Sequence, residues 1–355
     1  MNNHTLLERS GLALWITVLA CGVATADDNA LIRGTSNAHD PSSIVEHDGR
    51  YYLFFTGRGI SSRSSTDLRD WRTDSRVFER SETPQWIYEH VPGFRGHYWA
   101  PDLIELNGKY LLYYSASRFG KQTSAIGLAV NETLDPQDPN YAWRDAGMVV
   151  SSSEGAPYNA IDPSVLLDSD GRLWMVFGSY WNGIYLVELD AKTGGALQDA
   201  AEPVQLAYAE SIEAATLVRR GEYYYLFVNH GTCCRGVEST YRILVGRSED
   251  IQGPYIDREE GRLLEGGGTL VLDTEGRRIG PGHVAPIGDQ LKQFAFHFYD
   301  GENRGRSNLA TASWQWSDDD WPSATDVRLS DPKDVPPRWP QRTAEAVESD
   351  TTKEK

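Results

Sequence analysis

The chain has 355 residues, of which 40% are hydrophobic and 11% aromatic, and this composition is that of a folded protein with a large core rather than a disordered chain. Its 51 acidic and 34 basic residues give a formal net charge of −17. Nucleic acids and anionic membranes are polyanions, so most of such a surface repels them. We therefore expect no nucleic-acid partner and a ligand that is neutral or cationic.

The first 26 residues are predicted to be an export signal. Arg9 ends a short polar segment, residues 11–23 are apolar, and Ala24-Thr25-Ala26 has the small-residue pattern of a cleavage site. The mature protein would begin near Asp27 and be secreted or periplasmic. Acylation of Cys21 at a lipoprotein-type site is the alternative. No other run approaches the roughly 20 apolar residues that cross a bilayer, so no integral membrane segment is expected in the mature chain.

Beyond this signal the sequence contains two cysteines, Cys233 and Cys234. Because they are adjacent, they cannot link distant loops, and they lack the ligand spacing of a metal site. Two interpretations follow. Either they are two buried thiols, or they form a vicinal disulfide in an oxidising compartment.

One pattern recurs five times: an acidic residue near Pro or Ala (His in the last copy), a short apolar strand, a Gly-centred turn and an aromatic strand. The first four turn glycines are 59, 63 and 50 residues apart, about the length of a four-stranded blade with its loops. Five copies predict an all-β fold, a five-bladed β-propeller, over residues 27–330. The copies begin at His39-Asp40-Pro41, Ala100-Pro101-Asp102, Ile161-Asp162-Pro163, Ile212-Glu213-Ala214 and His283-Val284-Ala285.

The turns and the flanks of the repeats support this fold. Asp48-Gly49, Asn107-Gly108 and Asp170-Gly171 predict two-residue hairpin turns of type I′, which need positive φ at both central residues. The absence of long amphipathic helix patterns argues against a TIM barrel or a doubly wound sheet, which place a helix after almost every strand. Residues 331–355 are Pro-rich and charged and are expected not to fold.

The first residues of the five copies should meet at the axis, because the innermost strand of every blade lines the central channel. Asp40, Asp162, Glu213 and His283 hold this place. Breaking an acetal needs one carboxylic acid to protonate the leaving oxygen and one carboxylate to activate water or attack carbon. Counted from the turn glycine, Asp40 and Asp162 are equivalent, whereas Glu213 lies one residue later and Asp102 three. We interpret Asp102 as structural.

These motifs resemble glycoside hydrolase family 43, and in particular its endo-1,5-α-L-arabinanases, from about residue 30 to residue 325. The resemblance implies hydrolysis of arabinan. It is carried by Asn37-Ala38-His39-Asp40-Pro41, Tyr98-Trp99-Ala100-Pro101-Asp102, Asn159-Ala160-Ile161-Asp162-Pro163, Ile212-Glu213-Ala214, the segment from Cys233 to Tyr241, and Gly280-Pro281-Gly282-His283.

The resemblance also implies roles for individual residues. In an inverting mechanism Asp40 is the general base, Glu213 is the general acid, and Asp162 raises the pKa of Glu213 and orients it. The base and acid should be roughly 6.5–9.5 Å apart, which leaves room for a water molecule. His283 would hold calcium or another cation in the central channel, mostly through water. The implied substrate-binding residues are Asp40, Trp99, Phe119, Gly120, Asn159, Ala160, Ile161, Asp162, Ser179, Tyr180 and Trp181.

The sequence leaves several alternatives open. Within the family, an exo-acting arabinofuranosidase or a β-xylosidase would have a pocket closed at one end. Ala215 stands where the family often has Pro, and residues 229–232 depart from the commonest arabinanase form, which leaves the cleavage mode open. Outside the enzyme class, a carbohydrate-binding propeller or a scaffold for protein partners is possible, although all three acidic residues are present. We expect a monomer.

Overall fold

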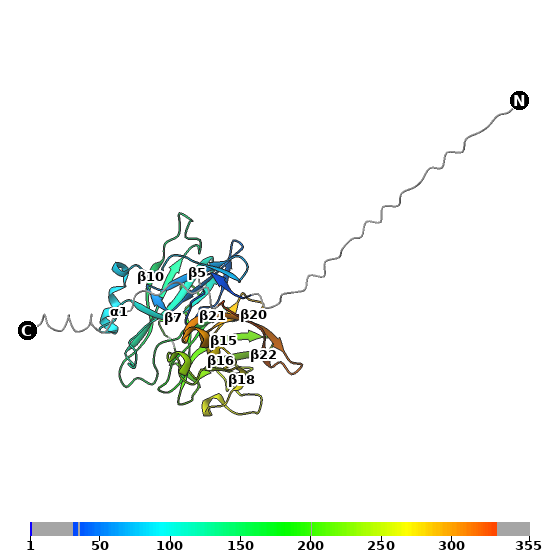
Figure 1. The fold of residues 1–355 in the computed structure, drawn as a ribbon. Helices are drawn as coiled ribbons and strands as arrows, with labels where there is room; N and C mark the ends of the chain where they lie inside the picture. The colour runs from blue at the N-terminus through cyan, green and yellow to red at the C-terminus, as the bar shows by residue number, and fades with distance from the viewer. Residues whose placement is uncertain (2–30, 35, 200, 332–355) are drawn as a thin grey trace, which may run out of the picture. The chain divides into compact units, whose positions relative to one another are not determined.

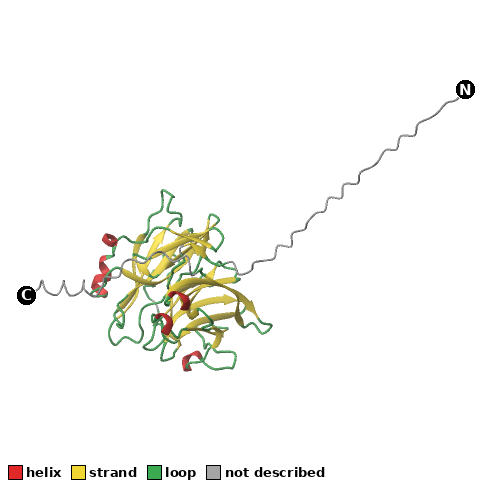
Figure 2. Cartoon of the chain, in the orientation of Figure 1, coloured by secondary structure: helices red, strands yellow, loops and turns green. Residues whose placement is uncertain are grey.

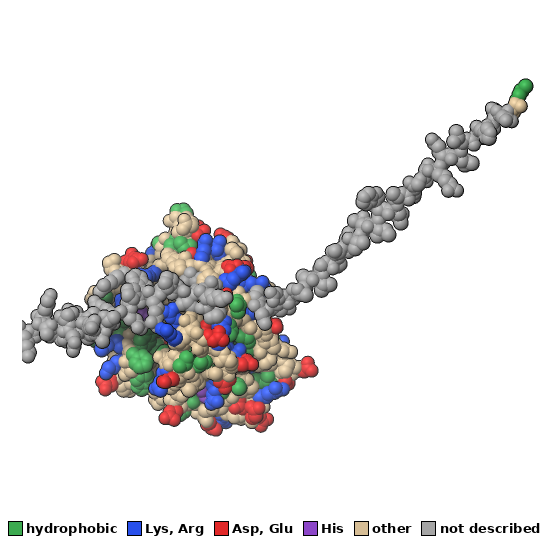
Figure 3. Space-filling model, viewed as in Figure 1, with side chains coloured by type: hydrophobic (Ala, Val, Ile, Leu, Met, Phe, Trp, Pro, Cys, Tyr) green, Lys and Arg blue, Asp and Glu red, His purple; other side chains and the backbone are tan. Residues whose placement is uncertain are grey.

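The computed structural model describes residues 1, 31–34, 36–199 and 201–331, and their strands form five sheets of four or five strands (Figures 1 and 2). The predicted five-bladed β-propeller is confirmed. The predicted signal peptide, Cys21 and the tail beyond Asp331 lie outside the described residues. Within these ranges no helix is long and apolar enough to cross a membrane. Figure 3 shows that acidic and basic side chains intermingle on the face in view.

Each blade is an antiparallel sheet whose strands run outward in chain order, with an extra short strand in the first two. In blade 1, β1 pairs in parallel with β6 at the outer edge. In blade 2, β4 pairs with β7. The strands of blade 1 are β1 (Arg33–Gly34), β2 (Val45–His47), β3 (Arg50–Phe55), β5 (Ser61–Ser65) and β6 (Asp70–Thr73). Those of blade 2 are β4 (Gly57–Arg58), β7 (His97–Leu106), β8 (Lys109–Ala116), β9 (Ser124–Asn131) and β10 (Arg144–Ser152).

The other three blades have four strands each, and the described helices are all short. Blade 3 contains β11 (Ser164–Leu167), β12 (Leu173–Phe177), β13 (Ile184–Leu189) and β14 (Val204–Ala207). Blade 4 contains β15 (Ile212–Arg220), β16 (Tyr223–His230), β17 (Arg242–Ser248) and β18 (Thr269–Leu272). Blade 5 contains β19 (Arg278–Ile287), β20 (Gln293–Asp300), β21 (Arg306–Trp316) and β22 (Pro322–Leu329). The helices are α1 (Gln85–His90), η1 (Arg80–Glu82), η2 (Gly236–Glu238), η3 (Leu263–Glu265) and η4 (Gly301–Asn303).

The aromatic second strands explain why the sheets pack as blades. Successive side chains of a strand point to opposite faces, and here both faces are buried. In β3, Tyr52 and Phe54 enter the cluster shared with blade 2, whereas Leu53 and Phe55 enter the cluster shared with blade 5. The same alternation in the other blades fills five seams with five apolar clusters. Continuous apolar strands, rather than alternating ones, are therefore what a propeller requires.

The hairpin turns follow the prediction in two cases of three. Both residues of Asp48-Gly49 and of Asn107-Gly108 have positive φ, as type I′ turns require. At Asp170-Gly171 only the glycine does, so the predicted two-residue turn is wrong there. β11 ends at Leu167 and β12 begins at Leu173, and the longer loop is closed by the Asp168 N–H, which donates to the carbonyl of Arg172 at 2.8 Å.

A left-handed residue stands near the start of each blade's innermost segment. In chain order the five are Asp40, Ala100, Asp162, Ala214 and His283, with φ of 50°, 38°, 58°, 53° and 60°. Positive φ is unfavourable for a residue with a Cβ, so each position needs support from its surroundings. In β7, β15 and β19 the pairing register shifts beside this residue. Such bulges bend a strand and redirect its side chains.

Each left-handed residue is held by a side chain of another blade. In four of the five seams this acceptor lies on, or directly after, the second strand of the preceding blade. The backbone N–H groups of Ala100, Asp162, His283 and Asp40 donate to Thr56 Oγ1 (2.9 Å), Ser115 Oγ (3.0 Å), Asn229 Oδ1 (2.9 Å) and His297 Nδ1 (3.1 Å). In the seam between blades 3 and 4 the Ala214 N–H donates to Asp162 Oδ2 at 3.1 Å. We call these acceptors the polar ring.

Replacing Asn229 with Ala should destabilise the propeller. Asn229 is 1% exposed, and besides accepting from His283 its amide donates to the Pro281 carbonyl at 3.1 Å. The substitution leaves buried backbone groups unpaired, so we expect a loss of about 2–4 kcal/mol in the free energy of unfolding, measured by urea denaturation. The exposed Asn140→Ala is the matched control and should change it little. An equal effect of both variants would contradict the role of the polar ring.

Candidate active site

The three acidic residues predicted to meet at the axis do lie together, although they come from blades 1, 3 and 4. Asp162 and Glu213 are each 7% exposed, and the Ala214 N–H, next to Glu213, donates to Asp162. Burial, and then repulsion by Glu213 and Asp40, raises the pKa of Asp162 well above its usual range. The three carboxyl groups are thus close enough to change one another's ionisation.

Asp40 lies among hydrogen-bond donors and histidines. Thr56 Oγ1 donates to its Oδ2 at 2.6 Å, and His39 Nδ1 lies 2.7 Å from the same oxygen. The Nδ1 atoms of His297 and His283 lie 3.6 and 3.7 Å from Oδ1. Burial alone would raise the pKa of Asp40, but the neighbouring histidines, His39 foremost, hold it well below its usual range. Asp40 is therefore ionised, which is the state that a general base needs.

Glu213 accepts a hydrogen bond on each oxygen. Ser179 Oγ donates to Oε2 at 2.6 Å, and Tyr241 OH donates to Oε1. Burial raises the pKa of Glu213; the two hydrogen bonds oppose this rise, and repulsion by Asp40 adds to it. Since burial raises the pKa of Glu213 and Asp162 alike, this pair keeps a proton under conditions in which Asp40 has lost its own. The site thus holds a proton donor and a proton acceptor.

A cluster of histidines surrounds Asp40. Among the described residues, His39, Asp40 and His297 form a group whose ligand atoms all lie within 4.8 Å of one another. His283 is beside it, and its buried Nδ1 has no hydrogen-bond partner. Nitrogen atoms dominate this donor set, whereas calcium prefers oxygen ligands. The residues fit a cation held through water molecules, and they do not fit a direct calcium cage.

Two loops bring predicted sugar-binding aromatic residues to the same end of the blades. β8 and β12 run antiparallel to the innermost strands, so both end where those strands begin. Phe119, after β8, is 82% exposed, and Trp181, after β12, is 40% exposed. Tyr180 and Trp181 both have positive φ, and the Tyr180 N–H donates to the carbonyl of Ile212 at 2.7 Å. This bond fixes the loop beside Glu213.

Most of the other predicted substrate-binding residues are less exposed to solvent. Asn159, Ala160 and Ile161 are buried, and Asn159 Oδ1 accepts from Ser124 Oγ at 2.7 Å. Trp99 is partly exposed, and its indole N–H donates to the neighbouring His97 at 3.0 Å. A Cβ added to Gly120, with φ of 69°, would meet open space. Contact of these residues with substrate stays a prediction.

Sequence reasoning assigned no role to four side chains that hold the carboxyl groups: His39, Thr56, Tyr241 and His297. Thr56 and Ser115 each stand seven residues after the turn glycine of their own blade, and both accept from a left-handed residue. This recurrence in the repeat is the signal that could have identified Thr56. Tyr241 reaches Glu213 from 28 residues away, and no local pattern indicates that contact.

Cys233 and Cys234 form a vicinal disulfide. Cys234 is exposed and Cys233 partly so, and the interpretation as two buried thiols is therefore wrong. The Cys234 N–H donates to the hydroxyl of Tyr299 at 2.8 Å, and its Sγ lies 3.8 Å from His39 Nε2. The disulfide thus borders the group of histidines around Asp40.

Two cavities lie beside the blades. One, of about 580 Å³, borders blade 4 at the end where Glu213 lies, and its lining includes Ser211, His230 and Gly231. Ser211 precedes Glu213 by two residues, and its carbonyl accepts from the Gly231 N–H at 3.1 Å. The lining is mostly polar and offers both hydrogen-bond donors and acceptors, the chemistry that suits a hydroxylated ligand.

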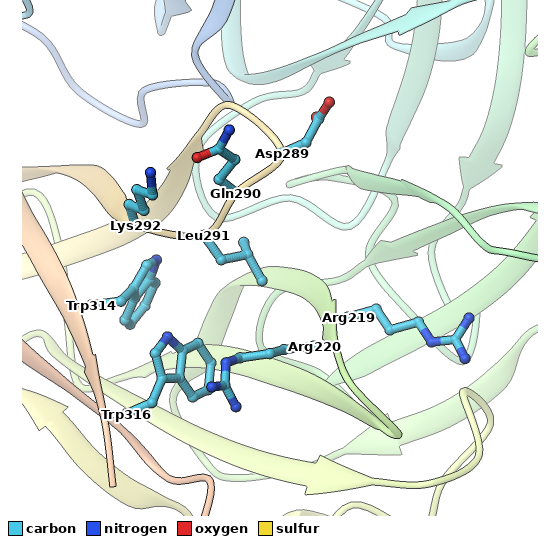
Figure 4. A pocket seen from close by; sticks show the side chains of 8 residues that line it. All are labelled: Arg219, Arg220, Asp289, Gln290, Leu291, Lys292, Trp314 and Trp316. Atoms are coloured by element: carbon cyan, nitrogen blue, oxygen red, sulfur yellow. The ribbon is translucent and has the colours of Figure 1, made fainter.

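The second cavity, of about 420 Å³, is lined by Arg219, Arg220, residues 289–292, Trp314 and Trp316 (Figure 4) and by none of Asp40, Asp162 and Glu213. It is bordered by Arg220, the last residue of β15, whereas Glu213 is the second residue of that strand. The cavity therefore lies toward the opposite end of the blades from Glu213. Phe294 stacks on Trp314 at 4.0 Å and Arg220 lies over Trp316 at 4.5 Å. Both indoles already have partners, which makes this cavity a poorer place for a sugar ring.

Together, the propeller and its axial carboxyl groups define an acid–base hydrolase of the type that cleaves glycosides. The chain belongs to glycosyl hydrolases family 43, whose family model matches residues 31–322. The family expected from the sequence motifs is thereby confirmed.

Individual relatives agree along most of the chain. It is 38% identical to an extracellular exo-α-(1→5)-L-arabinofuranosidase of Cellvibrio japonicus, over 90% of this chain and 92% of that protein. It is also 38% identical to an extracellular endo-α-(1→5)-L-arabinanase of Bacillus subtilis, over 89% and 97%. A crystal structure of Cellvibrio cellulosa α-L-arabinanase with arabinohexaose is 36% identical and superposes with a TM-score of 0.77, over 82% of this chain and 96% of that one.

Replacing Tyr241 with Phe should shift the pH profile of the enzyme. The Tyr241 hydroxyl stabilises the ionised form of Glu213, so its loss favours the protonated form and raises the pKa of Glu213 further. The alkaline limb of kcat/KM should move to higher pH, while the acidic limb, set by Asp40, stays in place. Ser179→Ala should act in the same direction. A shift of the alkaline limb to lower pH would contradict this account.

Proposed function

We propose that this family 43 enzyme hydrolyses the α-1,5-linked backbone of arabinan with inversion, cutting within the chain. The observation that carries the chemistry is the opposed ionisation of its carboxyl groups: the pKa of Asp40 is held low, while those of Asp162 and Glu213 are raised. Environments that push the pKa values of neighbouring acids apart are how a site assigns one base and one acid.

In this mechanism Asp40 takes a proton from water as the water attacks the anomeric carbon. Glu213 donates its proton to the leaving oxygen, and Ser179 and Tyr241 then stabilise the carboxylate that forms. Burial and the repulsion between Asp162 and Glu213 favour a proton on this pair, and Asp162 accepts the Ala214 N–H, which ties the two residues together. The expected base-to-acid separation of roughly 6.5–9.5 Å belongs to this proposal.

Two considerations support arabinan and cleavage within the chain. The relatives act, by name, on α-1,5-linked arabinose in both exo and endo modes, so identity alone does not choose between them. Phe119 and Trp181 are exposed at the active-site end, and apolar ring faces suit stacking on furanose rings. Aromatic residues on loops from two different blades suit a polymer that extends past the carboxyl groups. A single terminal sugar would not need both.

Product analysis on linear α-1,5-arabinan tests the proposal. We expect a ladder of arabino-oligosaccharides from the first minutes, resolved by chromatography, because an endo-acting site binds internal segments of the polymer. Glu213→Gln, which keeps the shape but has no proton to donate, should release no sugar above background. One mono- or short-sugar product from the outset would establish the exo-acting alternative. Binding without cleavage by the parent would establish the carbohydrate-binding alternative.

We further propose that His283 holds a cation, such as calcium, through bound water beside Asp40. The unpartnered Nδ1 of His283 supports this, and the cation would add positive charge near the base. After dialysis against EDTA, calcium at a hundredfold excess over its Kd should raise the free energy of unfolding by about 2.7 kcal/mol. His283→Ala should remove that gain. An unchanged unfolding curve and no heat of binding in calorimetry would refute the site.

The place of the enzyme is also part of the proposal. Residues 1–26 would direct export, which agrees with relatives that are named extracellular. An oxidising compartment suits the disulfide between Cys233 and Cys234. Acylation at Cys21 is the alternative that would tether the enzyme, and the mature chain is proposed to act as a monomer.

A further inference from the structure

We propose that Tyr299 and the Cys233–Cys234 turn are positioning elements of the general base, acting through His39, so that the redox state of the disulfide sets the rate of the base step. This inference rests on the proposed role of Asp40. It adds a function for the disulfide and for a tyrosine outside the catalytic motifs.

A continuous series of hydrogen bonds connects the disulfide turn with the base. The Cys234 N–H donates to Tyr299 OH at 2.8 Å. Tyr299 OH lies 2.7 Å from His39 Nε2, and His39 Nδ1 lies 2.7 Å from Asp40 Oδ2. The ring of His39 also stacks on His297, with centroids 4.0 Å apart. Contacts at both nitrogens and on one face fix the imidazole.

The donors of this series can be assigned from its ends. A backbone N–H can only donate, so the Tyr299 oxygen accepts from Cys234. The Tyr299 hydroxyl hydrogen can point at His39 Nε2, 2.7 Å away, which is much nearer than Cys234 Sγ at 3.9 Å. A bare nitrogen 2.7 Å from a carboxylate oxygen would be repulsive, and His39 Nδ1 therefore carries a proton and donates to Asp40 Oδ2. Burial opposes a charge on His39, but Asp40 raises its pKa. In neutral His39 the Nε2 atom accepts from Tyr299, and in charged His39 the Nε2–H donates to the Tyr299 oxygen, while Nδ1 donates to Asp40 in both states.

The same assignment selects one oxygen of Asp40 for catalysis. Oδ2 accepts from both His39 and Thr56, at 2.7 and 2.6 Å. The nearest ring atoms to Oδ1 are 3.6 and 3.7 Å away, and His297 Nδ1 is itself occupied by the Asp40 N–H. Oδ1 is thus the oxygen left to take the proton of the attacking water. A rotation of the His39 ring would remove its hydrogen bond to Oδ2, and the two oxygens of Asp40 would then no longer be distinguished.

The disulfide fixes the donor at the far end. Cys234 has a φ of 68°, a conformation that few residues with a side chain adopt, and the bond to Cys233 ties it into a small ring. A dithiol reductant would break the S–S bond and form two cysteine thiols, while its own two thiols become a disulfide. The freed turn can then relax, and the Cys234 N–H leaves Tyr299.

The first test compares Tyr299→Phe and dithiothreitol treatment on two substrates. One is linear arabinan, and the other is an aryl arabino-oligosaccharide whose nitrophenolate leaves without an acid. We expect kcat to fall about tenfold on both substrates with KM nearly unchanged, a part of the roughly 100-fold or greater gain that a general base supplies. Tyr241→Phe alters the proposed acid, so its kcat should fall much less on the aryl substrate than on arabinan.

Controls separate positioning from folding. Tyr225→Phe removes another tyrosine hydroxyl bond, to the Asp320 carbonyl, and should alter stability without altering kcat. The double variant Cys233→Ser with Cys234→Ser should match the reduced parent and ignore dithiothreitol. In His39→Asn, whose amide can still donate to Asp40 but cannot reach Tyr299, both Tyr299→Phe and reduction should have no further effect.

Two results would overturn the proposal. If reduction or Tyr299→Phe leaves kcat unchanged and raises KM, the Cys233–Cys234 turn contributes to substrate binding and not to positioning of the base. Additive losses in the His39→Asn background would mean that Tyr299 does not act through His39. If the parent cleaves neither substrate, the proposed function fails instead. The series of hydrogen bonds from Cys234 to Asp40 is then tested by ¹⁵N NMR of labelled histidine. If Nδ1 of His39 stays protonated and its signal changes neither on reduction nor in Tyr299→Phe, the proposal is refuted.

Discussion

The hydrogen bonds that hold five left-handed residues at the axis are the constraint on which the rest of the structure depends. An N–H buried at the centre of a propeller must find an acceptor, and a positive φ at a residue such as Ala100 or Ala214 persists only when its surroundings enforce it. The polar ring meets both needs at once, since the acceptors join one blade to another and the bond from Asp40 to His297 connects the last blade to the first. The apolar seams supply most of the stabilisation, whereas the ring fixes register.

The same ring explains where the chemistry lies. Three of its five seams carry their acceptor on a neutral Thr, Ser or Asn side chain. The two that differ are the two beside the proposed general base and general acid. Between blades 5 and 1 the acceptor is His297, and histidines gather around Asp40. Between blades 3 and 4 the acceptor is the carboxyl group of Asp162, and Ser179, which stands where a ring acceptor is expected, donates to Glu213 instead. The structural repeat thus departs from its pattern at two places, which are those of the proposed base and the proposed acid.

Much of this could be predicted from the sequence, because the repeat is local. Turn glycines and aromatic strands set the number of blades, and counting from the glycine placed Asp40 and Asp162 in one slot, which the structure shows to be the left-handed position. Glu213 fell outside that count because the left-handed residue of its blade, Ala214, stands seven rather than nine residues before the turn glycine, where the register of β15 shifts. Asp170-Gly171 read as a tight turn, but the loop is longer. Tyr241 and Tyr299 were beyond sequence reasoning, since their contacts with Glu213 and His39 join residues 28 and 260 positions apart.

These constraints separate the residues at the propeller axis from the loops at the active-site end of the blades, which we call the rim. Catalytic groups held by backbone bonds on packed strands need little rearrangement when charge develops in the transition state, which is what makes such a site effective. The proposed sugar-binding residues Phe119 and Trp181 are exposed on loops beyond the strands, where sequence changes do not disturb the seams. Endo and exo relatives of equal identity to this chain are the expected result of that separation. The axis fixes which bond chemistry is performed, and the rim decides where along a polymer it occurs.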